Sequence, residues 1–258
     1  MWLMLQKSVF LIRVRLSGRG VRVMGFDVEY GDVPSLYAEY GMIVLDRIYH
    51  FDAKTQTPLI IDGGGHIGMS VLYFKSVYPQ ARVVCFEPDG AAFRILKRNV
   101  EENRLDGVEL VQAALASDVG VRGFKPDGSD GGRLVDERDS EVKVKTVRLS
   151  EYLSNPVDFL KLNIEGMELP VLREAEASGR LRNVREMVLE YHGFAGEGQR
   201  LGAILDLLDR QGFRYLVHSF NAETCGAAWP PFHLTPQTRW FCLVYAKRVG
   251  GGVEMNAG

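Results

Sequence analysis

The sequence predicts an α/β fold built on one large, mostly parallel sheet. Short apolar segments alternate with helical segments along most of the chain, which is the pattern of a sheet covered by helices. The apolar segments lack strict polar–apolar alternation, as expected of parallel strands buried on both faces. No convincing helix separates the last two, so we expect them to pair as an antiparallel hairpin. The seven expected strands lie at 58–62, 82–87, 108–112, 157–163, 184–190, 213–218 and 240–247.

Three regions are expected along the 258 residues. Residues 1–57 form a small cap of strands and a helix, residues 58–250 form the main domain, and residues 251–258 form a flexible tail. The apolar stretch at 1–12 contains polar interruptions and is too short to span a bilayer. We therefore expect it to pack against the fold or to form the contact of a homodimer.

Local signals place the elements of the cap. Two short strands are expected on either side of Gly25, followed by a helix from Leu36 to Tyr49. Asp32 and Ser35 are candidate N-caps, because short polar side chains accept hydrogen bonds from the first free N–H groups of a helix. The helices expected in the main domain cover 93–100, the residues from about Met167 onward, and 201–208.

Two segments of the main domain are expected to be loops. Residues 123–133 are rich in glycine and aspartate, and residues 221–238 carry a Trp-Pro-Pro sequence. Long insertions near strand ends often form lids or substrate walls, although plain surface loops have the same composition. With the cap, these segments are our candidates for the wall of the acceptor site.

Bulk composition narrows the classes of partner. The net charge of −2 provides no basic field, so we expect no nucleic-acid partner and no stable membrane insertion. The three cysteines are far apart in the sequence and form no C-x-x-C motif. This usage favours a reduced, cytoplasmic setting without a metal cage.

The most informative motif is a glycine-rich turn between the first main strand and the helix after it. The strand ends in Asp62 and is followed by Gly63, Gly64 and Gly65, while the next strand ends in Glu87. Glycine lets the backbone approach a ligand closely. An acid at the end of the second strand is placed to accept both hydroxyl protons of a ribose. Together they predict a site for a nucleoside-bearing cofactor.

Two cofactors fit this pattern. Gly63, Gly65 and Gly68 match the dinucleotide motif G-x-G-x-x-G, which keeps an NAD-dependent oxidoreductase open. Asp62 favours S-adenosyl-L-methionine, because a carboxylate there can bind its ammonium group directly or through water. The same carboxylate would repel the pyrophosphate of a dinucleotide.

Five ordered motifs resemble the FkbM family of S-adenosylmethionine-dependent methyltransferases. They are Ile60–Gly68, Phe86–Asp89, Gln112–Ala114, Val157–Glu168 and Glu190–His192. The resemblance implies a class I methyltransferase fold, which is Rossmann-like, with seven strands and a terminal antiparallel hairpin. It also implies S-adenosyl-L-methionine as cofactor and a methyltransferase activity. The leading expectation is O-methylation of a hydroxyl on a small molecule or glycan.

The resemblance also implies a set of cofactor-binding residues at the strand ends. They are Asp62, Gly64, Gly65, His66, Gly68, Glu87, Pro88, Ala113, Ala114 and Asn163. Relatives usually carry asparagine in place of His66 and aspartate in place of Asn163. A histidine can still donate to the methionine carboxylate, and its charge responds to its surroundings. Loss of the carboxylate at Asn163 keeps open a non-catalytic, cofactor-binding domain.

Candidate catalytic residues follow the fourth and fifth main strands, because ligands of open α/β sheets bind beyond the carboxyl ends of the strands. His192 is the preferred base, since a neutral imidazole accepts a proton near pH 7. Glu165, Glu190 and Asn163 complete the set. A purely structural role remains open for each, and no spacing of histidines and acids predicts a metal site.

Overall fold

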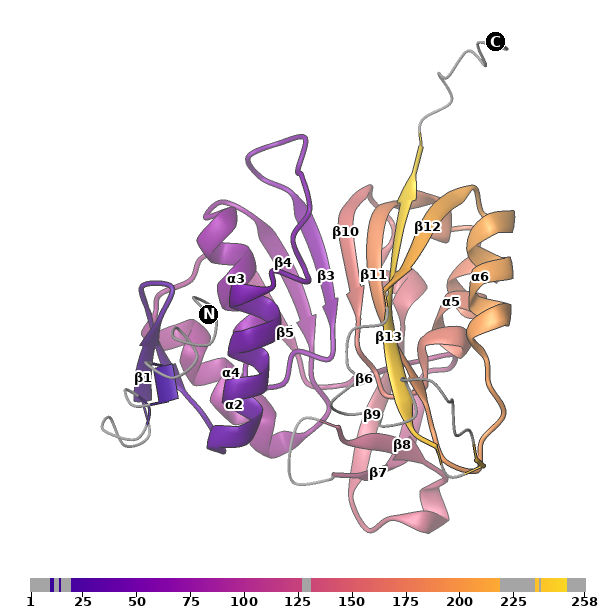
Figure 1. Ribbon diagram of the computed structural model, residues 1–258, viewed down its shortest axis with the longest axis horizontal. Helices are drawn as coiled ribbons and strands as arrows, with labels where there is room; N and C mark the ends of the chain where they lie inside the picture. Colours follow the sequence, from indigo (N-terminus) through magenta and orange to yellow (C-terminus); the bar gives the residue numbers. More distant parts are fainter. Residues whose placement is uncertain are drawn as a thin grey trace.

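The computed structural model describes residues 10, 11, 14, 20–126, 131–218, 235, 236 and 238–249, and all structural statements below refer to these. The main sheet has seven strands in the order β12-β13-β11-β10-β3-β4-β5 (Figure 1). β13 runs antiparallel to β11 and β12, and the other pairs are parallel. The strands are β3 (Leu59–Gly63), β4 (Arg82–Phe86), β5 (Val108–Val111), β10 (Val157–Leu162), β11 (Val184–Gly193), β12 (Phe213–His218) and β13 (Trp240–Arg248).

This arrangement confirms the predicted α/β class, the seven-stranded sheet and its antiparallel hairpin. The central strands β3, β10 and β11 are buried on both faces, as their continuous apolar runs indicate. Ile60 packs into the cluster beneath α3 and α4, and its neighbour Ile61 packs into the cluster beneath α5 and α6. Both side chains are fully buried. The helices are α3 (Met69–Val77), α4 (Gly90–Glu102), α5 (Glu168–Ala177) and α6 (Leu201–Arg210), with short 3-10 turns at Leu149–Tyr152 and Leu181–Asn183.

The N-terminal segment packs on α4. Its strands β1 (Gly20–Val23) and β2 (Phe26–Glu29) form an antiparallel hairpin around Gly25, as predicted. The Asn99 side chain of α4 accepts from the Glu29 N–H at 2.7 Å and donates to the Glu29 carbonyl at 2.9 Å. Hydrogen bonds between the backbone of Glu29 and the side chain of Asn99 therefore attach the N-terminal segment to α4 of the main domain.

The predicted helix from Leu36 to Tyr49 is wrong in its extent. Helix α2 (Val33–Glu39) begins at Asp32, whose side chain accepts from the Ser35 N–H at 2.8 Å, as a predicted N-cap should. At Glu39 the backbone changes to a π-helix, η1 (Tyr40–Leu45), whose wider turns end the α-helical register before Tyr49. Such π-helical turns are rare and frequently occur at functional sites.

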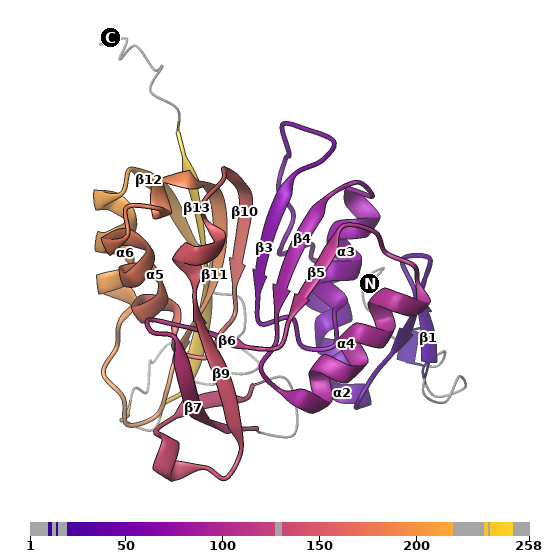
Figure 2. The ribbon, with the colours of Figure 1, turned by 180° about the vertical axis from the view of Figure 1, so that it is seen from behind.

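A second, four-stranded sheet was not predicted. It has the order β6-β9-β7-β8 and lies beyond the carboxyl ends of the main strands (Figure 2). Because β7 and β8 occupy both ends of 123–133, the expectation of an aperiodic loop there is wrong for the described residues. Of 221–238, only Thr235, Pro236 and Thr238 are described. The new elements are β6 (Ala114–Ala116), β7 (Gly120–Lys125), β8 (Arg133–Val135), a 3-10 turn at Glu137–Asp139, and β9 (Lys143–Arg148).

The ranges of the chain that the structure describes include no helix with both the length and the apolar character needed to cross a bilayer. This finding concerns those ranges alone.

Phe159 on β10 packs the main sheet against Phe51, which precedes the first strand of that sheet. Substitution of Phe159 tests this contact. Its ring stacks on Phe51 with centroids 4.4 Å apart and meets Phe74 edge-on at 5.8 Å. We expect Phe159→Ala to lower the free energy of unfolding by about 3–5 kcal/mol, because it leaves a cavity in a closed cluster. Leu216→Ala, at a residue 74% exposed on the edge strand β12, should change it by no more than about 0.5 kcal/mol. Urea denaturation measures both, and equal effects would contradict the assignment.

Candidate active site

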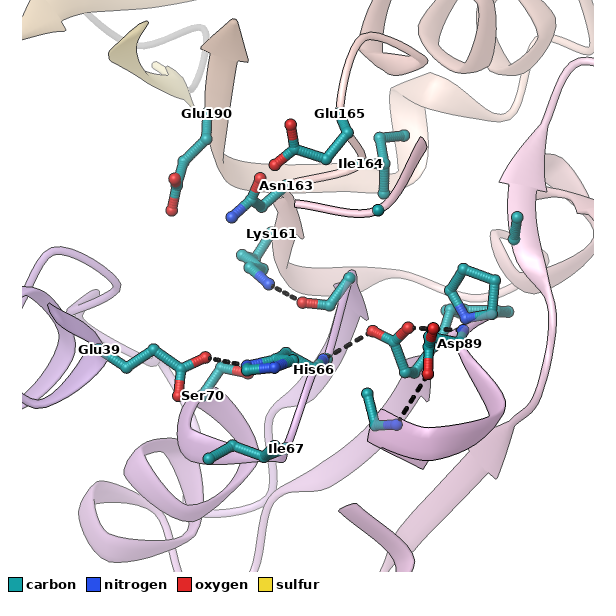
Figure 3. A pocket seen from close by; sticks show the side chains of 18 of the residues that line it. Glu39, His66, Ile67, Ser70, Asp89, Lys161, Asn163, Ile164, Glu165 and Glu190 are labelled. Carbon is teal, nitrogen blue, oxygen red and sulfur yellow. Dashed lines mark hydrogen bonds and ion pairs between the residues drawn. The ribbon is translucent and has the colours of Figure 1, made fainter. Parts of the chain in front are cut away.

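A cavity of about 440 Å³ lies where the carboxyl ends of β3, β4, β10 and β11 meet (Figure 3). The turn after β3, the start of α4 and the loop after β10 form its walls, and residues of α2, η1 and the second sheet complete them. The structure brings most of the predicted site residues together there. Those lining the cavity are Gly64, Gly65, His66, Glu87, Pro88, Ala113, Ala114, Asn163, Glu165 and Glu190.

Three predicted site residues do not line this cavity. Asp62 is fully buried beneath the turn, and Gly68, at φ +95°, is the residue before α3. His192 lines a separate, much smaller pocket beside Phe194. The roles assigned to these three from the sequence remain predictions, and any contact with a ligand in the main cavity would pass through their neighbours.

The glycine turn fits tightly between two strand ends. Gly64 has φ +87°, and a Cβ atom there would lie 1.9 Å from the carbonyl oxygen of Asn163. The N–H groups of Gly64 and Gly65 both donate to the Phe86 carbonyl, at 3.0 and 2.9 Å. The turn is thus held against the ends of β4 and β10, and no side chain from Gly64 or Gly65 separates its backbone from the cavity.

Lys161 and Asp62 form a buried ion pair below the turn. The Lys161 Nζ atom lies 3.1 Å from Asp62 Oδ1 and also donates to the Gly64 carbonyl. Ser70 donates to the other carboxylate oxygen of Asp62 at 2.5 Å. Burial opposes the charged form of Lys161, but the carboxylates of Asp62 and Glu190 outweigh it and raise its pKa. Sequence reasoning missed Lys161, although a lysine inside an apolar strand was a usable signal.

Glu87 is arranged as a multiple acceptor. Its side chain accepts from the His66 N–H at 2.7 Å and from the Asp89 N–H at 2.8 Å. Burial raises the pKa of Glu87, and these two N–H donors oppose that effect. A carboxylate offers about four acceptor positions, so two remain for hydroxyl groups of a ligand. The residues at the turn and Glu87 therefore fit the nucleoside end of the predicted cofactor.

His66 connects the turn to the N-terminal segment. It adopts φ +47°, a left-handed conformation that is uncommon outside glycine. Its Nδ1 atom lies 2.7 Å from Oε1 of Glu39, at the end of α2, and both side chains are mostly buried. Glu39 was not among the predicted site residues, because nothing in the sequence relates it to a residue 27 positions away.

Polar side chains also surround the opposite end of the cavity. Asn163 and Glu165 follow β10, and Glu190 lies on β11 (Figure 3). The Tyr49 hydroxyl donates to Glu190. Burial, the largest cause, and the negative charge of Glu190, the second, raise the pKa of Tyr49 well above 10. Tyr49 therefore remains a proton donor at neutral pH. Glu165 is paired with His192, whose Nε2 atom lies 3.6 Å from its carboxylate.

The cavity wall is strongly acidic. Its basic residues, within the described ranges, are one lysine and one histidine, Lys161 and His66. Because Lys161 is already paired with Asp62, the wall favours a ligand with positive charge. In the same ranges, no group of three or more histidines, cysteines and acids is arranged to hold a metal ion. The six acidic lining residues are Asp32, Glu39, Glu87, Asp89, Glu165 and Glu190.

Comparison with known proteins gives one consistent result. The family described as Methyltransferase FkbM domain matches residues 62–215. Methyltransferase 1 of Beauveria bassiana is 30% identical over 158 residues, and the match covers 51% of this chain and 64% of that protein. Methyltransferase sdnD of Sordaria araneosa is 28% identical over 205 residues, covering 65% and 79%. The 2-O-methyltransferase NoeI of Sinorhizobium fredii is 28% identical over 176 residues, covering 58% and 71%.

Substitution of Gly64 tests the close approach at the turn. We expect Gly64→Ala to lower the free energy of unfolding by about 3 kcal/mol or more, because a methyl group meets the Asn163 carbonyl and φ is positive. Gly179→Ala is the matched control, since Gly179 has φ +68° with open space around it. It should cost only about 1–2 kcal/mol, the penalty of the left-handed conformation. Similar losses in thermal or urea denaturation would refute a steric role at Gly64.

Glu168, buried at the start of α5, predicts a pH dependence of stability. Its carboxylate accepts from the N–H groups of Ile164 and Gly166, but burial outweighs these bonds and raises its pKa to about 7. The folded protein thus holds this proton more tightly than the unfolded chain. The resulting stabilisation is complete below about pH 4.5 and is lost as the pH rises to about 7, a change of about 3 kcal/mol.

Urea denaturation of the wild type and Glu168→Gln across this pH range measures that change. The stability of the wild type relative to Glu168→Gln should fall between pH 4.5 and 7, because the glutamine cannot lose a proton there. Glu102→Gln, at an exposed residue of α4, should run parallel to the wild type. A constant difference between wild type and Glu168→Gln would show that Glu168 does not titrate in this range.

Proposed function

We propose, from the premise that this chain belongs to the FkbM methyltransferase family, that it methylates a hydroxyl group of a small molecule or glycan with S-adenosyl-L-methionine as donor. The observation that carries the proposal is the single cavity that joins Glu87, at the nucleoside end, to Asn163, Glu165 and Glu190 at the other. The name of the relative NoeI, a 2-O-methyltransferase, supports oxygen as the methylated atom.

The residues of the nucleoside end have separate tasks in this proposal. Glu87 accepts hydrogen bonds from the ribose hydroxyls, and the backbone at Gly64 and Gly65 allows close approach. Ala113 and Ala114 leave room for the adenine because their side chains are small. Bound S-adenosyl-L-methionine supplies a methyl group already activated by its sulfonium. The protein therefore gains most by positioning, which can supply roughly 7–11 kcal/mol of a barrier at best.

At the acceptor end, Glu165 is our candidate for the base. It lines the cavity, and a carboxylate in contact with a hydroxyl can receive its proton, an effect worth about 10²–10⁴-fold. His192 then acts through Glu165 as a positioning residue, since its ring is paired with that carboxylate at 3.6 Å and does not line the main cavity. Glu190, held by Tyr49, is the second carboxylate in reach of an acceptor.

The acidic wall supports a methyl donor over a dinucleotide. S-adenosyl-L-methionine carries two positive groups, a sulfonium and an ammonium, and one negative carboxylate. NAD instead carries a pyrophosphate with two negative charges. An anionic ligand would meet the carboxylates of Glu39, Glu165 and Glu190. In the described part of the chain, the two basic lining residues, Lys161 and His66, are already paired with acids. A non-catalytic, cofactor-binding role has no such observation in its favour.

Calorimetric titration tests the donor. We expect the wild type to bind S-adenosylhomocysteine and to show no comparable binding of NAD. Glu87→Ala should weaken the binding of S-adenosylhomocysteine about 10- to 100-fold, because a buried charged acceptor of hydrogen bonds is lost. Glu109→Gln, at an exposed residue of β5, is the control and should leave affinity unchanged.

Transfer of a radiolabelled methyl group to a panel of alcohols, sugars and amines tests the acceptor. We expect the label on hydroxyl oxygen. Glu165→Gln should lower kcat strongly and change KM much less. Binding of NAD without binding of S-adenosylhomocysteine would overturn the donor. Label found only on nitrogen would overturn the proposed O-methylation and leave the donor intact.

A further inference from the structure

We infer that Glu39, fixed by His66, is the residue that recognises the α-ammonium group of the methyl donor. The inference rests on the proposed function and assigns a specificity-determining role to a residue outside the family match, which begins at residue 62. The donor's amino-acid end would then be recognised by the N-terminal segment together with the glycine turn.

The first argument is the arrangement of two carboxylates around His66. The backbone N–H of His66 donates to Glu87 Oε2, and its ring is bonded to Glu39 Oε1, each at 2.7 Å. Glu87 and Glu39 therefore contact the same residue of the turn, His66. A ligand whose ribose binds Glu87 extends past His66 toward Glu39. Figure 3 shows the Glu39 carboxylate pointing at the His66 ring, with Ser70 beside it. All three of these labelled residues line the cavity.

The second argument is an acceptor without a donor. The Glu39 side chain is 13% exposed. Its Oε2 atom is buried and has no hydrogen-bond partner within the described part of the chain. Buried polar atoms are nearly always paired, so this oxygen calls for an N–H or O–H group from a ligand. Oδ1 of Asn163 lines the same cavity in the same condition. An ammonium group has three N–H donors and one positive charge, which suits a carboxylate oxygen such as Oε2 of Glu39.

The third argument is the position of Glu39 on its helix. It is the last residue of α2, immediately before the π-helical turns of η1, and Met42 and Ile43 of η1 also line the cavity. The bond to His66 engages Oε1 and so fixes the plane of the carboxylate. A carboxylate already held through Oε1 loses less side-chain freedom when Oε2 meets a donor from a ligand. The His66 side chain thus orients Glu39.

A cycle of two ligands and two proteins tests this contact. The ligands are S-adenosylhomocysteine and its deamino analogue, in which hydrogen replaces the ammonium group. We expect wild-type protein to bind S-adenosylhomocysteine about 10- to 100-fold more tightly than the analogue. In Glu39→Gln this preference should fall to about threefold or less, while affinity for the analogue changes by less than about threefold. Glu29→Gln is the matched control, since Glu29 pairs with Arg98 and does not line the cavity.

His66→Asn provides an independent arm if Glu39→Gln does not fold. It keeps a polar residue in the turn but shortens the side chain that orients Glu39, so it should also reduce the preference for the ammonium-bearing ligand. Equal weakening of both ligands by Glu39→Gln would overturn the inference, because it would mark a structural role. An unchanged preference in both variants would overturn it as well. Wild-type protein that binds neither ligand would overturn the proposed function, and this inference with it.

Discussion

The buried ion pair between Lys161 and Asp62 is the constraint on which the rest of the site depends. The two residues are register partners on adjacent parallel strands, β10 and β3. Desolvating both charges is expensive, and the cost is offset only where further polar groups complete their hydrogen bonding. Ser70 donates to the second carboxylate oxygen of Asp62, and Lys161 donates in addition to the Gly64 carbonyl. The position of the glycine turn is thus tied directly to the pairing of two strands and to the first turn of α3.

This constraint also explains why the cap takes part in the site. Asp62 is directed inward to Lys161 and does not line the cavity, so its charge is largely neutralised before a ligand arrives. A positively charged group above the turn must find another anion. Glu39 is held there by His66. The glycine turn is therefore in direct contact with the N-terminal segment, through a residue 27 positions earlier in the chain.

The sequence predicted the structure well where the surroundings of a residue depend mainly on its position in its own strand. Ile60 and Ile61 sit in a run buried on both faces, and Glu87 terminates its strand, so the sheet and the residues at its edge were predictable. Contacts between distant segments were not, and Glu39 with His66 is the clearest case. The second sheet was missed because β6 and β8 have only three residues each and Gly123 interrupts β7. The alternation of polar and apolar residues in β9 (Lys143–Arg148) was a usable signal. The change from α2 to a π-helix also has no local signal.

Asn163 is better understood as a consequence of crowded charge than as a lost function. It follows β10 beside Glu165 and shares the cavity with Glu190 and Glu39. A further carboxylate at this position would face three others, and like charges in a partly buried site raise the pKa of one another. An amide retains an acceptor oxygen without adding a further negative charge to the cavity. Six acidic residues already line the cavity, so the neutral side chain at 163 keeps its negative charge from rising further.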